Sequence, residues 1–286
     1  MGTAQERLDV ALVRRGLARS RTQAERLVRE GRVQLAGVAV TKASRKVEPD
    51  AALTVQAGEH PDYVGRGALK LAGVLDELAA LGAAPAVSSR RCLDAGASTG
   101  GFTEVLLQRG AAEVVAVDVG HDQLDATLRG HPRVRELSGT SVRGLPPQAV
   151  GGPVDLVVGD LSFISLQLVL TDLAALVRPG ADLLLLVKPQ FEVGKSRLGS
   201  GGVVRDPVLR ADALVAVARA GQELGLVVRA LRPSRWPGPS GNVEYFVWFS
   251  AQDDEPADGR STDLPPQLAA DDLPAAAKRA VEEGPT

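Results

Sequence analysis

Two lysines and two carboxylates are the residues of this chain best suited to chemistry: Lys70, Asp160, Lys188 and Glu244. Three of them stand at ends or faces of segments with a strand pattern, and a glycine-rich segment, 94–101, lies between the first two. A lysine can take a proton from a hydroxyl once its pKa is lowered from the ordinary value of about 10.4. The four residues therefore predict a site that deprotonates a hydroxyl while a cofactor at the glycine-rich segment alkylates it.

The composition of this 286-residue chain is that of an ordinary soluble globular protein with room for two domains, since 44% of its residues are hydrophobic and 24% are charged. No apolar run reaches the roughly 18–20 residues that span a bilayer, and the N-terminus has no apolar core typical of an export signal. The single cysteine, Cys92, excludes a cysteine-rich metal site. We therefore expect a cytoplasmic, monomeric protein with no metal and no membrane partner.

The net charge of −2 hides an uneven distribution along the chain. Residues 1–60 hold 11 basic and 7 acidic side chains, whereas residues 251–286 hold 3 basic and 9 acidic ones. A basic segment of this kind is typical of proteins that bind a polyanion. The distribution thus predicts a polyanion partner for the first 60 residues.

This basic segment also has the pattern of a small α+β domain. Apolar residues at helical spacing indicate helices over 8–16 and 20–31, each ending at a glycine. The second helix opens on Ser20-Arg-Thr-Gln23, which fits a capping box. Alternating apolar residues predict a tight hairpin over 33–40 and a last short strand within 47–55.

Arginine outnumbers acid on the outer faces of both predicted helices. A surface built for solubility usually mixes both signs, so a phosphate-binding surface is favoured over the alternative of a solvated helix face. The pattern of leucines, glycines and small residues over 8–33 resembles the S4-type RNA-binding domain, which implies RNA as the polyanion. The arginines expected to contact it, one of them beyond this segment, are Arg14, Arg15, Arg19, Arg21, Arg26, Arg29, Arg32 and Arg66.

Beyond residue 67 the chain predicts one α/β domain built on a doubly wound, mainly parallel, seven-stranded Rossmann-like sheet. A helix is expected from about residue 68 to Gly82, and further helices centre near residues 105, 125, 170 and 215. The predicted strands are Arg91–Ala95, Val114–Val119, Val134–Leu137, Val154–Asp160, Asp182–Lys188, Leu226–Leu231 and Val243–Phe249. The expected organisation is an RNA-binding domain over 1–60, a linker over 61–67, the α/β domain over 68–250 and an acidic tail over 251–286, which is disordered over 251–268 and helical over Leu273–Glu283.

The glycine-rich segment, Asp94-Ala-Gly-Ala-Ser-Thr-Gly-Gly101, ends one predicted strand and opens a helix. It departs from the G-x-G-x-x-G pattern, in which a helix N-terminus receives a pyrophosphate, and so favours a cofactor without phosphate. Asp118, at the end of the second predicted strand, suits a carboxylate that binds ribose hydroxyls. We therefore expect S-adenosylmethionine here, with a nicotinamide nucleotide or a simple strand-to-helix turn as the alternatives.

The run Leu93–Phe102 resembles the motif of FtsJ-like RNA 2′-O-methyltransferases, whose Lys-Asp-Lys-Glu tetrad is matched in order by the four residues named first. With the segments 160–165, 188–194 and 238–246, the layout is most similar to the TlyA family of ribosomal RNA 2′-O-methyltransferases, also labelled haemolysin-like. The chain departs from the family at Gly65, where serine is common, and in lacking a basic residue before Tyr63. The cofactor contacts that we expect on this basis are Asp94, Gly96, Ser98, Thr99, Gly100, Gly101, Phe102, Asp118, Val119, Ser141, Asp160 and Leu161.

The resemblance implies methylation of a cytidine ribose in ribosomal RNA, in the large subunit and in some members also in the small subunit. We favour Lys188 as the residue that faces the hydroxyl, while Lys70, Asp160 and Glu244 position it. One alternative is a non-catalytic RNA-binding or ribosome-assembly factor with a methyltransferase fold. A membrane-active protein, as the haemolysin label suggests, is disfavoured because the chain has no spanning segment and only 3% aromatic residues.

Overall fold

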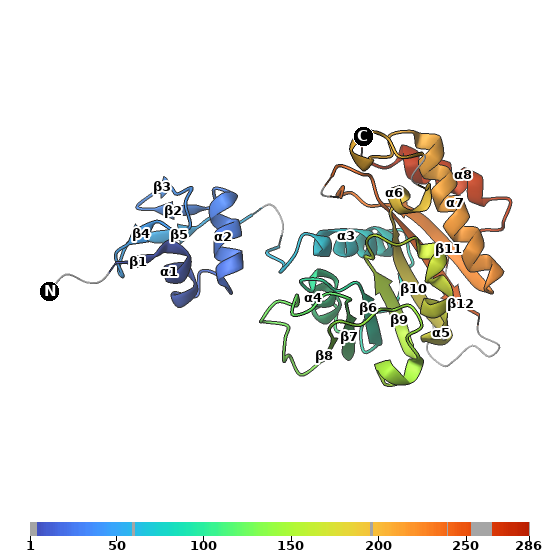
Figure 1. Ribbon diagram of the computed structural model, residues 1–286, viewed down its shortest axis with the longest axis horizontal. Coiled ribbons are helices and arrows are strands. Elements are labelled where there is room, and N and C mark those ends of the chain that lie inside the picture. The colour runs from blue at the N-terminus through green and yellow to red at the C-terminus, as the bar shows by residue number, and fades with distance from the viewer. Residues whose placement is uncertain (1–4, 59–60, 195–196, 239, 253–264, 286) are drawn as a thin grey trace. The chain divides into compact units, whose positions relative to one another are not determined.

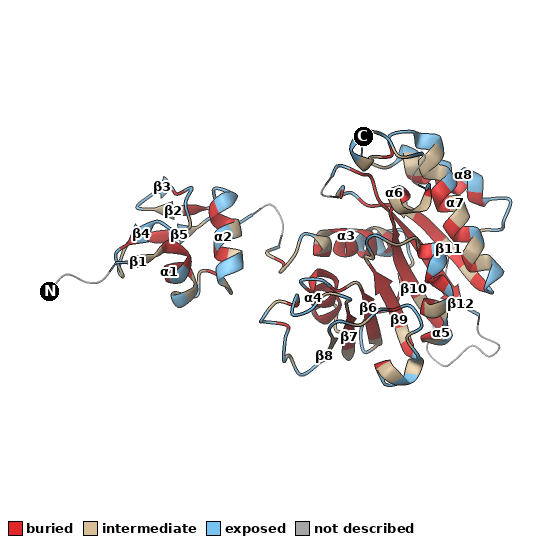
Figure 2. Cartoon of the chain, in the orientation of Figure 1, coloured by how far each residue is buried: buried red, intermediate tan, exposed pale blue. Residues whose placement is uncertain are grey.

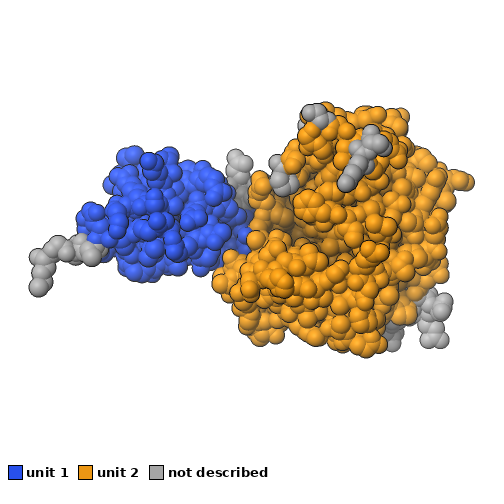
Figure 3. All heavy atoms as spheres, viewed as in Figure 1, with its two compact units in different colours: residues 1–64 blue, residues 65–286 orange. Residues whose placement is uncertain are grey.

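The computed structural model describes residues 5–58, 61–194, 197–238, 240–252 and 265–285. The chain divides into two compact units, Met1–Val64 and Gly65–Thr286, which Figure 3 colours separately. Most of the tail segment predicted to be disordered, residues 253–264, lies outside the described residues. No helix among the described residues is long and apolar enough to cross a membrane.

Unit 1 is a small α+β domain in which two helices pack on short antiparallel strands (Figure 1). The strands pair as β3-β2-β5 and as β1-β4. Its elements are β1 (Glu6–Arg7), α1 (Leu8–Arg14), α2 (Arg21–Arg29), β2 (Val33–Leu35), β3 (Val38–Ala39), β4 (Lys46–Val47) and β5 (Leu53–Val55). The single last strand predicted within 47–55 was therefore wrong. Val47 pairs with Glu6, whereas Leu53 pairs with Leu35, because the chain turns between them over residues 48–51.

Local sequence signals explain the ends of these elements. The hairpin turns at Ala36 and Gly37, which have φ of 49° and 80°, the left-handed pair that a two-residue hairpin loop requires. Ser20 caps α2 by accepting a hydrogen bond from the Gln23 backbone N–H at 3.2 Å. The Gln23 side chain accepts from the N–H of Arg19 rather than of Ser20, so the predicted capping box closes one residue early.

Unit 2 is built on a seven-stranded sheet in the order β11-β12-β10-β9-β6-β7-β8, which confirms the predicted fold class. β12 runs antiparallel to both of its neighbours, and the other described pairs are parallel. The central strands are buried on both faces, as their continuous valine and leucine runs predict (Figure 2). The strands are β6 (Arg91–Ala95), β7 (Glu113–Val117), β8 (Val134–Leu137), β9 (Val154–Gly159), β10 (Val177–Val187), β11 (Leu226–Pro233) and β12 (Tyr245–Ala251).

Helices cover both faces of this sheet (Figure 1). α5, α7 and α8 pack on one face over a continuous apolar core, whereas α3 and α4 lie against each other on the other face. There the Phe102 ring of α4 stacks on Phe246 of β12, with ring centroids 6.3 Å apart. The helices are α3 (Gly67–Ala80), α4 (Gly101–Gln108), α5 (Leu170–Ala175), α6 (Pro189–Glu192), α7 (Pro207–Glu223) and α8 (Leu273–Glu282), with short 3₁₀ turns at Pro147–Val150, Leu166–Leu168 and Ser200–Gly202.

The helix predicted near residue 125 was wrong. Leu124 and Leu128 are both buried and four residues apart, which is a helical spacing, but residues 118–130 form bends and turns. The Thr127 N–H bonds to its neighbouring side chain, Asp125 Oδ1, at 2.9 Å, and the Asp125 N–H reaches the carbonyl of Thr99 at 3.1 Å. These bonds replace the regular helical ladder, because Asp favours local side-chain turns.

The strand order reverses beside β6, which has β7 on one side and β9 on the other. Doubly wound sheets bind ligands at the carboxyl ends of the strands at such a switch point. The segment 96–100 follows β6, Asp118 follows β7, Asp160 follows β9 and Lys188 follows β10. The fold therefore brings the predicted chemical groups to one edge of the sheet.

Candidate active site

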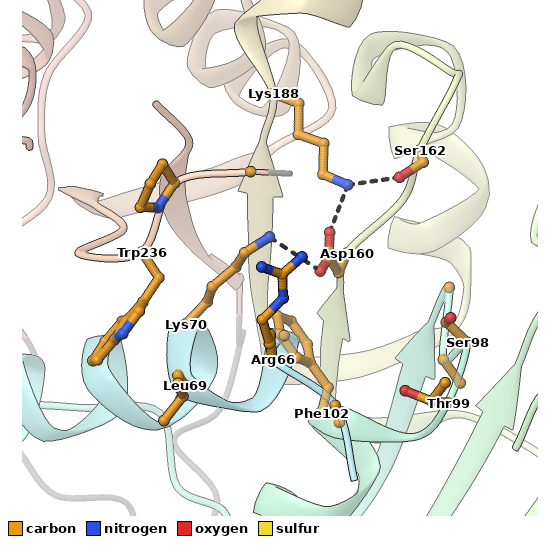
Figure 4. Close-up of a pocket in the computed structure, with 17 residues that line it drawn as sticks. Arg66, Leu69, Lys70, Ser98, Thr99, Phe102, Asp160, Ser162, Lys188 and Trp236 are labelled. Carbon is orange, nitrogen blue, oxygen red and sulfur yellow. Dashed lines mark hydrogen bonds and ion pairs between the residues drawn. The ribbon is translucent and has the colours of Figure 1, made fainter. Parts of the chain in front are cut away.

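Four charged side chains form one continuous network at this edge. Lys70 Nζ lies 2.6 Å from Glu244 Oε2 and 3.6 Å from Asp160 Oδ2. The other oxygen of the same aspartate, Oδ1, lies 2.6 Å from Lys188 Nζ (Figure 4). Asp160 thus stands between the two ammonium groups, and the charges alternate in sign from Glu244 to Lys188.

Burial makes these pairs mutually dependent. Lys70 and Lys188 are each 7% exposed and Glu244 is 1% exposed. Buried charges persist only when they are paired, and removing one partner leaves an uncompensated charge that is strongly destabilising. A buried network of four charges is a feature typical of a functional site, because apolar residues would fill the same space with equal or greater stability.

Each member comes from a different element. Lys70 lies in the first turns of α3, Asp160 follows β9, Lys188 follows β10 and Glu244 immediately precedes β12. Because β12 is antiparallel, its first residues lie at the same edge as the carboxyl ends of the parallel strands. The Ser234 N–H donates to the Glu244 carbonyl at 2.8 Å and extends the β11–β12 ladder to this residue.

Close backbone approach explains the glycines of the cofactor segment. Gly96 has φ of 83°, and a Cβ there would lie 3.0 Å from the carbonyl oxygen of Asp160. Gly101 opens α4 against α3, where a Cβ would lie 2.9 Å from the Ala68 nitrogen. A Cβ at Gly65 would lie 2.5 Å from Thr99 Oγ1, so the glycine that departs from the family pattern fits a close contact with this segment. Larger residues would push the segment away from the network.

Asp118 is held at the other side of the same segment. Its Oδ2 accepts from the Ser98 N–H at 2.8 Å, and its Oδ1 accepts from the Gly120 N–H at 2.7 Å. Each carboxylate oxygen keeps a second lone pair. The side chain can therefore receive further hydroxyl donors without losing its backbone contacts.

Asp94 is fully buried beneath the segment. Its Oδ2 accepts from the Thr103 hydroxyl at 2.7 Å, while its Oδ1 has no hydrogen-bond partner among the described residues. Burial raises the pKa of Asp94 to about 7, and the hydrogen bonds from Thr103 oppose that rise. This carboxyl is therefore poised to change its protonation state near neutral pH.

Two cavities meet at these residues. One of about 470 Å³ is lined by the network residues Lys70, Asp160 and Lys188 together with Trp236 and Gly238. The second, of about 420 Å³, is lined by residues from the ends of β7 and β9. Gly96, Ser98, Asp160 and Ser162 line both. The two cavities thus adjoin over the glycine-rich segment.

The residues predicted to bind a cofactor are divided between these cavities. Thr99, Gly101 and Phe102 line the first, whereas Asp118, Val119, Ser141 and Leu161 line the second. Asp94 and Gly100 are buried and are not among the described residues that line either cavity. The predicted residues Gly96, Ser98 and Asp160 line both cavities. In all, ten of the twelve predicted cofactor contacts line one cavity or the other.

The arginines predicted to bind RNA are not equivalent in the structure. Within unit 1, Arg14 pairs with Glu6 at 2.6 Å, Arg15 donates to the carbonyls of Pro49 and Ala51, and Arg19 donates to the carbonyl of Asp62. These contacts connect chain segments and give the arginines a structural role beside any RNA contact.

The arginines of α2 and its surroundings also differ from one another. Arg26 and Arg32 lie 3.7 Å and 2.6 Å from the Asp62 carboxylate. Arg21 shares the buried Asp9 with Arg7, and hydrogen bonds from these two guanidinium groups hold the pKa of Asp9 at about 2.

Five of the predicted arginines are exposed to solvent: Arg14, Arg19, Arg21, Arg29 and Arg66. Arg29 is exposed, and no hydrogen bond or ion pair of its side chain occurs within the described part of the chain. In unit 2, Arg66 is exposed and lines the first cavity.

Three residues at the site were missed from the sequence. Ser162 accepts a hydrogen bond from Lys188 Nζ at 2.7 Å. Trp236 lines the first cavity and packs so closely on α3 that a Cβ at Gly73 would lie 2.4 Å from its ring. Gly238 lies against Glu244. The spacing Asp160-x-Ser162 was the available signal for the serine, while the other two depend on the path of a loop.

Comparisons with known proteins agree with this arrangement. Residues 63–251 match the FtsJ-like methyltransferase family, and residues 6–53 match the S4 domain. The chain is 53% identical over 279 residues, or 98% of both chains, to the 16S/23S rRNA (cytidine-2′-O)-methyltransferase TlyA of Mycobacterium tuberculosis. It is 40% identical over 86% of both chains to the rRNA methyltransferase candidate YqxC of Bacillus subtilis.

A solved structure points the same way. A hemolysin candidate from Streptococcus thermophilus superimposes with a TM-score of 0.70 at 34% identity, covering 99% of this chain and 98% of that one. Among the described residues, no group of three or more histidine, cysteine, aspartate or glutamate side chains could hold a metal ion. Sequence motifs, fold and similarity agree, and the chain belongs to the TlyA family of FtsJ-like methyltransferases that carry an S4 domain.

Proposed function

We propose that this protein transfers a methyl group from S-adenosylmethionine to the 2′-hydroxyl of cytidine ribose in ribosomal RNA of both subunits. The proposal depends on one observation, the continuous series of ion pairs from Glu244 through Lys70 and Asp160 to Lys188. This series lies where the two cavities adjoin. The M. tuberculosis relative, which bears the 16S/23S cytidine name, supports this choice of nucleotide and subunits.

The described residues fit the proposed cofactor. Gly96, whose left-handed backbone lies against the Asp160 carbonyl, lines both cavities and leaves a cradle that a Cβ would narrow. Asp118 offers free lone pairs to ribose hydroxyls, and Val119, 71% exposed in the second cavity, offers an apolar contact to a base. Among the described residues, no lysine or arginine lines the second cavity to bind a pyrophosphate, which favours a cofactor without phosphate there.

When bound, S-adenosylmethionine supplies the methyl group from a sulfonium and leaves as the neutral thioether. The ribose hydroxyl must then lose its proton as its oxygen bonds to the methyl carbon. Lys188 Nζ is placed to receive that proton, because it reaches the first cavity from the end of β10. The residues of the second cavity would hold the cofactor, and this cavity shares Asp160 and Ser162 with the first, so a methyl donor in it would adjoin a hydroxyl bound in the first.

Lys70 and Glu244 serve a different purpose. Glu244 neutralises Lys70, and Lys70 in turn lies 3.6 Å from Asp160. This fixes the Asp160 carboxylate, whose other oxygen holds Lys188. The outer pair therefore positions the base through Asp160 rather than touching the hydroxyl.

Selection of RNA follows from the two units together. The S4 domain carries exposed arginine that can contact phosphates without reading sequence. The reacting group, a 2′-hydroxyl, is absent from DNA. The pairing of a phosphate-binding unit with such a site supports RNA as the substrate.

Methyl transfer to ribosomal subunits that lack the modification tests the proposal. Purified protein with isotope-labelled S-adenosylmethionine should label RNA of both subunits, and nuclease mapping should place the label on cytidine 2′-oxygens. Lys188→Ala should abolish labelling while leaving cofactor affinity within about threefold. Binding of RNA without any methyl transfer would instead support a non-catalytic assembly factor and overturn the proposal.

A further inference from the structure

Ser162 accepts a hydrogen bond from the active-site lysine, which also forms an ion pair with Asp160. Its Oγ lies 2.7 Å from Lys188 Nζ, and Asp160 Oδ1 lies 2.6 Å from the same nitrogen (Figure 4). Lys188 is buried, whereas Ser162 is exposed and lines both cavities. The serine therefore stands where the two cavities join, in contact with the group that receives the proton.

We propose that Ser162 is a positioning residue that directs the lone pair of neutral Lys188 toward the ribose hydroxyl. The inference rests on the proposed function. A neutral amine keeps two N–H bonds and one lone pair. If Asp160 and Ser162 accept the two N–H bonds, rotation about the Cε–Nζ bond is fixed, and the lone pair takes the remaining tetrahedral direction.

With Asp160 as the sole acceptor, the amine would rotate about one hydrogen bond, and its lone pair would face the hydroxyl in only part of the rotamers. The proton then passes from the ribose oxygen to Lys188 Nζ less often in the geometry that transfer needs. Ser162 accepts a hydrogen bond in this scheme and gains or loses no proton itself.

The segment that carries Ser162 is held firmly against the segment that carries Lys188. The ring of Phe163 packs on the ring of Phe191, with centroids 5.5 Å apart. Glu192 accepts from the Ser165 hydroxyl at 2.6 Å and from the Leu166 N–H at 2.7 Å. These contacts join residues 163–166 to α6, which begins directly after Lys188, and they keep the Ser162 hydroxyl in place independently of its bond to the lysine.

The backbone gives a further sign that this segment is built to a fixed geometry. Phe163 has φ of 64°, a left-handed conformation that a bulky residue seldom adopts. Such a conformation persists where the surrounding contacts determine it. The turn at Phe163 therefore fixes the direction in which the residue before it, Ser162, leaves the end of β9.

The test compares three substitutions at one position with a matched control. Ser162→Ala removes the acceptor, Ser162→Cys keeps the size but accepts hydrogen bonds weakly, and Ser162→Thr keeps the hydroxyl. Ser88→Ala, the control, removes an exposed hydroxyl that lines neither cavity and lies outside the segment that carries Ser162. Methyl transfer to RNA is measured under single-turnover conditions.

Ser162→Ala and Ser162→Cys should lower the rate of transfer at saturating substrates about 2- to 10-fold, the range expected for one hydrogen bond between neutral groups. The KM for RNA and the Kd for the cofactor should change less than about threefold. Ser162→Thr should restore most of the rate, and Ser88→Ala should leave the rate unchanged.

Each contrary result has a distinct meaning. A wild-type rate in Ser162→Ala, with Lys188→Ala inactive, would overturn this inference and leave the proposed function intact. A lower rate with no rescue by threonine would assign Ser162 a structural role and equally overturn it. Absence of methyl transfer by the unaltered protein would overturn the proposed function itself. Circular dichroism and thermal melting of each variant identify any that fail to fold. If Ser162→Ala is one of them, the comparison of Ser162→Cys with Ser162→Thr decides whether the hydroxyl is needed for the rate.

Discussion

Gly238 lies so close to Glu244 that a Cβ at position 238 would stand 2.6 Å from Glu244 Oε1. The loop between β11 and β12 therefore passes directly over the carboxylate that begins the charge network. The Gly238 N–H also donates to the Asn242 carbonyl at 2.9 Å, which closes the loop on itself. Any side chain at this position must displace either the loop or the carboxylate.

Gly238→Ala should reduce the rate of methyl transfer at least about tenfold, because a shift of Glu244 disturbs Lys70 and through it Asp160. Gly284→Ala is the matched control, since a Cβ there would meet its neighbours at ordinary distances of 3.4–3.5 Å. Single-turnover rates of both variants check the prediction. Equal activity of the two variants would show that the loop accommodates the methyl group without moving Glu244.

Lys70→Met should lower the free energy of unfolding by about 3–5 kcal/mol, because it leaves the 1%-exposed Glu244 as an unpaired buried charge. The double variant Lys70→Met/Glu244→Gln should recover most of that loss, since neither residue is then charged. Urea unfolding followed by fluorescence gives both values. Activity should stay low in both variants, and a double variant no more stable than the single one would argue against direct coupling.

Asp94 should make the stability of the protein depend on pH in an unusual direction. Its pKa is raised from 3.8 to about 7, so the folded state binds a proton more tightly than the unfolded state between these values. Its contribution to stability is therefore present below about pH 4 and is lost as the pH rises through about 7.

Asp94→Asn should lack this loss, so its stability relative to the unaltered protein should rise between pH 5 and pH 8. Thermal melting of both proteins across this range measures the difference. Thr103→Val removes a hydrogen bond that opposes the raised pKa and should extend the loss to higher pH. A pH-independent difference between Asp94→Asn and the unaltered protein would contradict the assignment.

Arg29→Glu should weaken RNA binding and reduce the slope of log K against log salt by about 1, because this exposed arginine can contact a phosphate. Arg32→Gln should act differently, since Arg32 pairs with Asp62 at 2.6 Å and is mostly buried. We expect it to lower the melting temperature of unit 1 more than it changes the salt slope. Filter binding at several salt concentrations, with calorimetry of each variant, separates the two effects.

Much of the sheet and half of the network could be predicted from the sequence. Strands that are buried on both faces have continuous runs of valine and leucine, which the sequence shows directly. Asp160 and Lys188 follow two such runs, and the structure places these strands, β9 and β10, side by side in parallel. The contact of Glu244 with Lys70 was harder to predict physically, because it requires β12 to enter between β10 and β11. The contact between Glu244 and Lys70 was indicated only by the chemical types of the four residues and by the resemblance to the methyltransferase family.

The contacts that the sequence did not reveal have physical causes as well. The arginine-rich helices were interpreted as one phosphate-binding surface, yet several guanidinium groups bond to carbonyls and carboxylates within unit 1. Arginine can serve either purpose, and the sequence alone does not show which carboxylate will approach it. Ser162 was missed because a serine after a strand is common, and its meaning depends on the position of Lys188.

The position of β12 has a consequence for how the protein is made. β12 is the last strand among the described residues, yet it lies inside the sheet and pairs with both β10 and β11. A nascent chain that has emerged only through β11 holds Lys70, Asp160 and Lys188. It still lacks β12 and the Glu244 carboxylate that neutralises Lys70. Synthesis must therefore pass residue 244 before the charges can neutralise one another, and a chain truncated before that residue cannot assemble the active site.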